Sequence, residues 1–278
     1  MGKIYAVGKS FLSVDAGRSV SDTAHVLVEH MEPDEETPAK PLPEWALLEY
    51  FHMLQQVGIV GGKKEEAEAQ DDERKSTVVF SHLSQATCES LLKEINSRAS
   101  SVGGGGSAIA RALPDPTSSS FGGGEQLADC VCTSDSILEL MKRLGVSKET
   151  VCLLDPKAEQ ELSPSDGERF GWFLFGGILG DDPPRDRTAE LRVCGFPSRH
   201  LGPIQMTTDT ALAVTKRIVQ DGKTLDQLPW SLRPELVFNP KEKVQMPFRY
   251  LASPDGLPIM PDGMRELIRK DLDRAFEF

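Results

Sequence analysis

No apolar stretch of this 278-residue sequence approaches the roughly 18 consecutive residues that a membrane-spanning helix needs. The first residues, MGKIYAVGKSFLSVDAGRSVSDT, also lack the apolar core and the small-residue cleavage site of a secretory signal. We therefore predict a cytoplasmic protein that does not enter a membrane. A nuclear or organellar location stays open, because Lys3, Lys9 and Arg18 precede most of the acidic residues.

Cysteine is scarce, and its five positions are irregularly spaced: Cys88, Cys130, Cys132, Cys152 and Cys194. An odd number without regular spacing argues against a secreted disulfide framework. The pair Cys130-Val-Cys132 has two readings, a metal-binding pair or two small buried residues of a strand. We favour the strand and predict no metal, because the second Cys-x-x-Cys pair that usually completes a zinc site is missing.

Basic residues are outnumbered, with 31 Lys plus Arg against 43 Asp plus Glu and a net charge of −12. A protein that binds nucleic acid mainly through phosphates needs a basic surface. The balance therefore disfavours that class and favours a basic partner. The length suits one large domain or two small ones and allows a sizeable core.

Two stretches contain too few apolar residues to fold by themselves. One covers about residues 60–76 and is nearly all polar or charged, and the other covers about 97–126 and is rich in Gly, Ser and Pro. Neither can bury enough apolar surface to offset the entropy of ordering, so we predict two flexible insertions. Residues 1–23 are predicted to be an N-terminal extension, and residues 24–278 a single domain that carries the insertions.

Strands and helices alternate between these stretches, which predicts an α/β fold with a mainly parallel sheet flanked by helices. Apolar runs predict strands over 24–30, 76–83, 129–134, 149–156 and 170–178. Helical periodicity predicts helices over 44–58, 85–95 and 134–146, the last capped by Ser134 or Asp135 and stopped at Gly145.

The last third of the chain has a different pattern. It predicts a helix that is capped by Thr207, Thr208 or Asp209 and ends at Gly222. Two short extended segments are predicted within 235–251, followed by an amphipathic tail helix over 263–278.

Three turn-rich loops follow predicted strands, at the carboxyl edge where ligands collect in open α/β sheets. They begin at Asp155-Pro156, at FLFGGILGDDPP (173–184) and at CGFPSRHLGPIQMTTD (194–209). Glycines there let a ligand approach the backbone closely, and the helix start at Thr207 offers unpaired amides. A strand-exit turn alone would also explain Gly176-Gly177, and the G-x-G-x-x-G dinucleotide pattern is absent.

Three stretches of the sequence resemble the SPOUT-class methyltransferases that use S-adenosylmethionine. They are LLDPKAEQELSPSDGERFGWFLFGGILGDDPPRDRTAELR, GFPSRHLGPIQMTTDTAL and LVFNPKEKVQMPFRYL. The resemblance covers most of residues 24–251 and is strongest to the fungal protein-arginine methyltransferases that modify a small-subunit ribosomal protein. It implies a C-terminal trefoil knot, S-adenosylmethionine as cofactor, and a pocket made by two knot loops. Carried onto this chain, the loop residues are Leu174, Phe175, Gly176, Gly177, Ile178, Gly180, Leu201, Gly202, Ile204, Gln205, Met206 and Thr207.

An arginine substrate needs a carboxylate, because the guanidinium stays protonated near neutrality and must be oriented and relieved of a proton. Glu29 is the first candidate, since a carboxylate that ends an apolar strand is otherwise costly. Glu32 and Asp181 are further candidates. Glu49 is expected to pair with a neighbour on a solvated helix face. His30 and His200 are expected to be structural residues, with His200 a possible loop donor.

The partner that the resemblance implies is a basic ribosomal protein, and its arginine subgroup suggests a monomer. The alternative is an RNA methyltransferase, whose basic face would combine Arg185, Arg187, Arg192, Arg199, Lys216 and Arg217. A third reading is a ribosome-assembly module without turnover. The ordinary role of the arginines in RDRTAELR (185–192) is salt bridging within that segment, and the three tryptophans are expected to serve packing.

Overall fold

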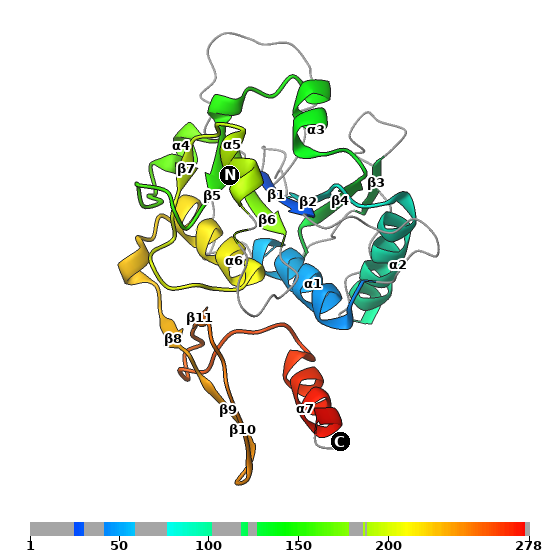
Figure 1. Ribbon diagram of the computed structural model, residues 1–278, viewed down its shortest axis with the longest axis vertical. Helices are drawn as coiled ribbons and strands as arrows, with labels where there is room; N and C mark the ends of the chain where they lie inside the picture. Colours follow the sequence, from blue (N-terminus) through cyan, green and yellow to red (C-terminus); the bar gives the residue numbers. More distant parts are fainter. Residues whose placement is uncertain are drawn as a thin grey trace, which may run out of the picture.

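A seven-stranded sheet organises the chain in the computed structural model, which describes residues 25–30, 42–58, 77–101, 118–121, 127–177, 186 and 188–275. The strand order is β3-β4-β2-β1-β6-β5-β7, and every pair is parallel except β3 with β4 (Figure 1). The predicted α/β fold with a mainly parallel sheet is confirmed. The strands are β1 (His25–His30), β2 (Thr77–Ser81), β3 (Ser118–Phe121), β4 (Asp129–Thr133), β5 (Val151–Leu154), β6 (Trp172–Gly177) and β7 (Ser198–Arg199).

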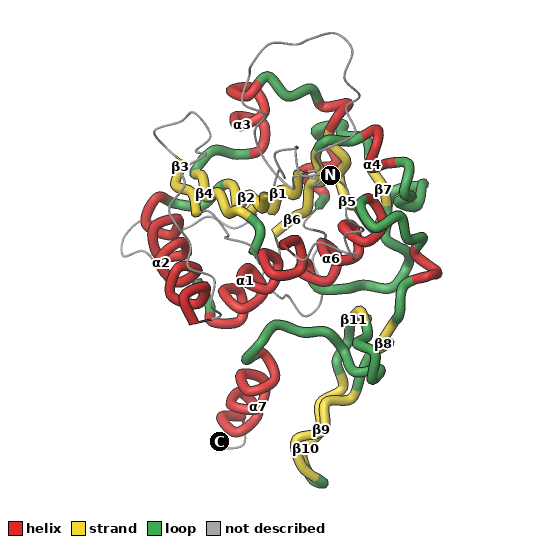
Figure 2. The backbone as a smooth tube through the Cα atoms, turned by 180° about the vertical axis from the view of Figure 1, so that it is seen from behind, coloured by secondary structure: helices red, strands yellow, loops and turns green. Residues whose placement is uncertain are grey.

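Helices cover both faces of the sheet (Figure 2). One face packs against α1 (Glu44–Gly58), α2 (Gln85–Ser101) and α6 (Thr208–Val219), and the other against α3 (Ile137–Leu144) and α5 (Ala189–Val193). Short helices α4 (Asp166–Arg169), η1 (Lys148–Thr150) and η2 (Leu225–Gln227) lie in the connections. This layering follows from parallel strands, whose crossover connections put helices on both sides.

Strand β6 shows why its sequence is a continuous apolar run. Phe173 and Phe175 join the cluster under α1, α2 and α6, whereas Trp172 and Leu174 join the cluster under α3 and α5. Successive side chains of a strand point to opposite faces, so a strand buried on both faces has no polar alternation. Phe173 is fully buried, which stabilises the fold by about 1.5–3 kcal/mol relative to an exposed side chain.

Helix α3 begins one or two residues later than the sequence predicts. Ser136, not Ser134 or Asp135, is the N-cap, and the capping box with Glu139 explains the difference. The Ser136 backbone N–H donates to the Glu139 carboxylate at 2.9 Å, and neither Ser134 nor Asp135 has a Glu or Gln three residues later with which to form this reciprocal arrangement. The predicted stop at Gly145 is confirmed, with φ of 65°.

Regular structure reaches into the stretch 97–126 that the sequence predicts as an insertion. Helix α2 continues to Ser101, and Ser118–Phe121 form β3, which pairs antiparallel with β4. A polar segment gains strand structure here because β4 supplies backbone hydrogen-bond partners that no local pattern announces. Residues 102–117 and the predicted extension and insertion at 1–23 and 60–76 lie outside the described residues.

The C-terminal part forms an arm that leaves the sheet (Figures 1 and 2). It contains β8 (Trp230–Leu232), β9 (Glu235–Asn239), β10 (Glu242–Gln245), β11 (Arg249–Leu251) and the predicted tail helix α7 (Met264–Ala275). Met264 and Leu267 of α7 pack against Leu48 of α1. Arg265 donates to the Val237 carbonyl and lies over the Phe238 ring at 5.1 Å, which ties the helix to the β9–β10 hairpin. Among the described helices, none has the length and apolarity to cross a membrane.

Candidate active site

The carboxyl ends of β1 and β6 lie side by side. In the parallel register Glu29 is opposite Gly176 and His30 is opposite Gly177. Helix α6 packs against β6, and α1 packs against α6. The candidate carboxylate at Glu29 and the first glycine loop therefore occupy the same edge of the sheet, next to the helix that follows the second loop.

Of the first predicted loop, Leu174 through Gly177 are described. The Leu174 side chain is fully buried in the cluster on the α3 side, so its side chain serves packing. Phe175 faces the opposite cluster, and Gly176 is buried. Ile178, Gly180 and the candidate carboxylates Glu32 and Asp181 lie outside the described residues, and for Glu29 and Gly177 only the backbone is described. Their predicted roles stay predictions.

The second predicted loop contributes side chains to the same hydrophobic cluster as the first. Leu201 and Met206 are buried in the same cluster as Phe175, whereas Gln205 is exposed. Gly202, Ile204 and Thr207 are partly buried, and Thr207 is the N-cap of α6, as the sequence allows. Helix α6 ends at Val219, three residues before the predicted stop at Gly222. Phe175 of the first loop and Leu201 and Met206 of the second thus belong to one hydrophobic cluster.

Arg249 of β11 fixes the second loop. Its backbone N–H donates to the Gln205 carbonyl at 3.0 Å, its guanidinium donates to the Leu201 carbonyl, and it lies 3.9 Å from the Trp230 ring centroid. Gly202 has φ of +86°, and a Cβ there would stand 3.0 Å from the Arg249 guanidinium. The loop needs glycine at this position for both its backbone angle and its close approach.

His200 accepts a hydrogen bond at Nδ1, which leaves Nε2 as the donor nitrogen of the neutral ring, so its predicted role as a loop donor stays a prediction. Its Nδ1 atom lies 3.0 Å from the Gly202 amide nitrogen, whose N–H can only donate. His200 thereby shapes the turn that leads into the glycine.

A buried acid stands in the first turn of α6. Asp209 is 1% exposed, and its Oδ2 atom lies 2.7 Å from His52 Nδ1 of α1. His52 Nε2 lies 3.0 Å from the Gln56 amide nitrogen, and Arg217 donates to the Gln56 carbonyl oxygen at 3.4 Å. Asp209 Oδ1 and Thr208 Oγ1 are buried without a hydrogen-bond partner in the described part of the chain.

Glu49 is not the solvated, paired residue that the sequence suggests. It is partly buried, and burial together with the nearby Asp209 charge raises its pKa well above the ordinary value. Burial, then Asp209, then Glu49 also raise the pKa of Tyr250, so these three side chains lie within electrostatic range of one another. The sequence missed this because α1 is covered on most of its surface; its buried residues are Ala46, Leu48, Tyr50, Phe51, His52, Met53, Leu54, Gln56 and Val57.

Glu49→Gln is expected to raise the melting temperature at neutral and alkaline pH. A carboxyl whose folded pKa is raised costs stability once the pH exceeds its unfolded pKa, and the cost grows until the folded pKa is reached. The increase in melting temperature should therefore be small near pH 4.5 and larger at pH 8. It should amount to about 2–4 °C for each kcal/mol by which the substitution raises the free energy of unfolding. Thermal melts across this range test it. Glu89→Gln is the matched control, because Glu89 is an exposed residue of α2. Equal melting temperatures of Glu49→Gln and wild type at every pH would contradict the burial of the Glu49 carboxyl group.

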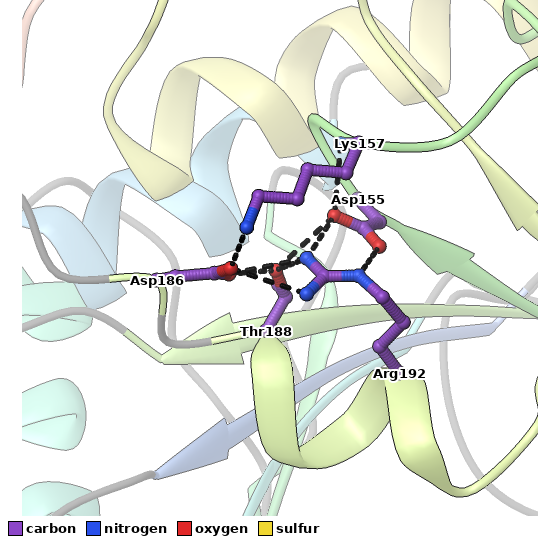
Figure 3. A network of polar contacts seen from close by, with 5 residues as sticks. All are labelled: Asp155, Lys157, Asp186, Thr188 and Arg192. Carbon is purple, nitrogen blue, oxygen red and sulfur yellow. Dashed lines mark hydrogen bonds and ion pairs between the residues drawn. The ribbon is translucent and has the colours of Figure 1, made fainter.

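Arg192 joins the end of β5 to the segment that follows the first loop (Figure 3). Its Nε lies 2.5 Å from buried Asp155, and its NH1 lies 3.1 Å from Asp186. Lys157 reaches Asp186 at 2.6 Å, and Thr188 donates to both carboxylates. The strand-end Asp155 is therefore a structural anchor, and the ordinary reading of Arg192 as a salt-bridging residue is confirmed.

An RNA methyltransferase would need a basic face, for which the sequence offers six residues. The four of them that the structure describes do not form such a face. Arg192 pairs with Asp155 and Asp186, Arg199 with buried Asp166, and Lys216 with Asp221. Arg199 and Lys216 are themselves buried, and Arg217 is half-buried against Gln56. These side chains are occupied by contacts within the protein, so they contribute little to binding a phosphate backbone. Arg185 and Arg187 lie outside the described residues.

Cys130 and Cys132 are buried in β4, with 3.9 Å between their sulfur atoms, as the strand reading predicts. Within the described ranges no group of three or more His, Cys, Asp or Glu residues is arranged to hold a metal ion. Trp172 packs in the core, and Trp230 donates to the Leu225 carbonyl at 3.1 Å while stacking under Arg249.

Comparisons with known proteins agree with the resemblance seen in the sequence. Residues 25–275 match the family model of SFM1-like protein arginine N-methyltransferases. The chain is 36% identical over 255 residues to protein arginine N-methyltransferase SFM1 of Saccharomyces cerevisiae, covering 90% of this chain and 97% of that protein. The crystal structure of the yeast enzyme complexed with S-adenosylmethionine (SAM) superimposes with a TM-score of 0.62 at 32% identity, over 89% of this chain and 91% of that one. The complex with S-adenosylhomocysteine (SAH) gives 0.60 at 32% identity, over 87% and 93%. The chain therefore belongs to the SFM1-like protein arginine N-methyltransferase family.

Proposed function

We propose that this protein transfers a methyl group from S-adenosylmethionine to an arginine of a basic ribosomal protein. The observation that carries the proposal is the place of Glu29 beside Gly176 at the carboxyl edge of the sheet, with Phe175, Leu201 and Met206 of the two predicted loops in one buried cluster. The yeast relative was crystallised with S-adenosylmethionine, which supports the same cofactor here. The net charge of −12 fits a basic polypeptide substrate.

The residues present fit this cofactor. Gly202 closes a turn that a Cβ would obstruct, and Thr208 Oγ1 is a buried polar atom without a partner among the described residues. We infer that Phe175, Gly176 and Gly177 wall one side of the pocket, and Ile178 and Gly180 with them. Leu201, Gly202, Ile204, Gln205, Met206 and Thr207 would wall the other, and Leu174 would contribute backbone only. When bound, S-adenosylmethionine supplies an activated methyl group on a good leaving group.

The chain itself must align the guanidinium and take up a proton. A guanidinium carries its proton at neutral pH, and the nitrogen that gains the methyl group must lose one. A carboxylate at this edge accepts that proton as the new N–C bond forms and the methyl–sulfur bond breaks. Glu29 is our first candidate because its strand position places it beside Gly176, and Glu32 and Asp181 are further candidates.

Two wider features belong to the same proposal. The resemblance to SPOUT methyltransferases implies a trefoil knot formed by the two loops, which would hold them together without a disulfide. The arginine subgroup implies a monomer, with the tail helix covering the face through which related enzymes dimerise. The packing of α7 against α1 and the β9–β10 hairpin supports this role.

Incubation with S-adenosylmethionine labelled on its methyl group tests the proposal. Purified ribosomal proteins and rRNA are offered separately, and the label is traced by electrophoresis and by amino-acid analysis. We expect label in a ribosomal protein, recovered as methylarginine. Label in rRNA alone would establish the RNA methyltransferase instead, and no label in either, with the cofactor bound, would favour a module without turnover.

Gly202→Ala is expected to weaken S-adenosylmethionine binding ~10-fold, because the added methyl meets Arg249 at 3.0 Å and the loop must shift to make room, at a cost of about 1–3 kcal/mol. Isothermal titration calorimetry measures the Kd. Gly256→Ala is the matched control, since it has φ of +79° and, within the described residues, nothing within 4 Å of the new methyl. Equal Kd values for both variants and wild type would place the cofactor elsewhere.

A further inference from the structure

Asp209 presents a buried oxygen without a partner. Its carboxylate is 1% exposed, its Oδ2 atom is satisfied by His52 at 2.7 Å, and its Oδ1 atom has no hydrogen bond within the described residues. An ionised oxygen that is out of water and unpaired is costly, by several kcal/mol in an apolar setting. Such groups are rare in native structures, and a catalytic role or a bound water or ion is a common explanation for them.

A series of hydrogen-bonded side chains, from Arg217 through Gln56 to His52, leads to the Asp209 carboxylate. Arg217 has only donors, so the Gln56 atom that it contacts at 3.4 Å is the carbonyl oxygen. The Gln56 amide then faces His52 Nε2 at 3.0 Å and donates to it. His52 is thereby left with its proton on Nδ1, which donates to Asp209 Oδ2. Asp209 Oδ2 is therefore the acceptor of the His52 N–H, and Asp209 Oδ1 is the oxygen without a partner among the described residues.

The ligand that this oxygen calls for is a cation with N–H donors. The Asp209 charge raises the pKa of Glu49 and of Tyr250, so a second carboxyl group and a hydroxyl lie within electrostatic range of Asp209. In the described part of the chain these residues do not make a metal site. A guanidinium offers several N–H donors in a plane and pairs well with carboxylates.

We propose that Asp209 receives the guanidinium of the substrate arginine, and that His52, held by Gln56 and Arg217, is the positioning residue that fixes the orientation of the Asp209 carboxylate. This inference rests on the proposed function and identifies the substrate-binding carboxylate of the same site. It is separate from the proton acceptor assigned above, because Asp209 binds the charge and need not take a proton.

The test begins with Asp209→Asn, which keeps the shape and removes the charge. With total ribosomal protein as methyl acceptor, we expect the KM for that acceptor to rise at least ~30-fold, since loss of one partner of a buried charge pair costs 2 kcal/mol or more. The Kd of S-adenosylmethionine should stay within threefold of wild type. An unchanged KM in folded Asp209→Asn overturns the inference.

The positioning role has its own pair of variants. His52→Asn keeps an N–H donor near the place of Nδ1, whereas His52→Leu fills the space without one. We expect the leucine variant to raise KM at least tenfold and the asparagine variant to remain within threefold of wild type. Equal KM values for the two variants overturn the positioning role, and this pair decides the inference if Asp209→Asn does not fold.

A separate readout distinguishes this inference from the proposed function. If wild type labels no protein, binding of arginine amide to protein saturated with S-adenosylhomocysteine is followed by NMR, with neutral citrulline amide as control. Preferential binding of arginine amide that is lost in His52→Leu and kept in His52→Asn supports the site although the proposed reaction fails. Equal binding of the two amides, or binding of neither, overturns it.

Discussion

Glu29→Gln is expected to lower kcat for methyl transfer to ribosomal protein at least ~100-fold, the lower range of what a positioned general base contributes. The physical reason is the place of Glu29 at the carboxyl end of β1, opposite Gly176 of β6. Glutamine preserves the size of the side chain and its ability to accept a hydrogen bond, but it cannot take up the proton that the guanidinium must lose. Rapid-quench measurement of a single turnover separates this step from product release.

The same variant should bind S-adenosylmethionine with the wild-type Kd, which calorimetry checks. Ser81→Ala is a matched control, because Ser81 is opposite Glu29 on the other neighbouring strand, β2. Wild-type turnover in Glu29→Gln would remove Glu29 as the base and direct the search to Glu32 and Asp181. A joint loss of cofactor binding and turnover would instead assign Glu29 to the cofactor pocket.

Arg192→Met is expected to lower the free energy of unfolding by about 3–5 kcal/mol, because it leaves the buried Asp155 carboxylate, 1% exposed, without its guanidinium. At about 2–4 °C per kcal/mol, the melting temperature should fall by roughly 6–20 °C. S-adenosylmethionine affinity should fall as well, because the segment at Asp186 and Thr188 that follows the first loop loses its anchor on β5.

The pH dependence gives this prediction a signature. Burial alone would raise the pKa of Asp155, but hydrogen bonds from Arg192 and the Lys157 backbone outweigh it and lower the pKa. Arg192, followed by Lys157, holds the pKa of Asp186 well below its ordinary value. Stability from carboxyls with lowered pKa is present above their unfolded pKa and is lost as the pH falls through the folded pKa. The gap in melting temperature between wild type and Arg192→Met should therefore narrow from pH 7 to pH 3.

Two comparisons make the result specific. Lys243→Met breaks an exposed pair with Glu235, in which both side chains are about half exposed, and should change stability by less than ~1 kcal/mol. Adding Asp155→Asn to Arg192→Met removes the stranded charge and should recover part of the loss. A full-sized loss in Lys243→Met, or no recovery in the double variant, would contradict the account.

The sequence by itself determined the layered α/β fold. Apolar runs such as WFLF indicate strands that are buried on both faces. Glycines at helix ends, and Ser, Thr, Asp and Glu at helix starts, indicate the turns between the elements. The sequence also placed two glycine loops at strand ends, because a carboxyl edge follows from alternation of strands and helices. It identified the family through the same loops, and the comparisons confirm that identification.

Tertiary structure alone decided which polar residues act together. His52 and Asp209 are 157 positions apart, and Arg192 and Asp155 are 37 apart, so no local pattern links either pair. The polar residues of α1 have the sequence pattern of a solvated helix face, and only the fold shows that α6 and α7 pack against this helix. The sequence therefore predicts a solvated Glu49, whereas the structure has it partly buried. Propensity and periodicity act over a few residues, whereas the burial and pairing of a charge depend on whatever the folded chain brings against it.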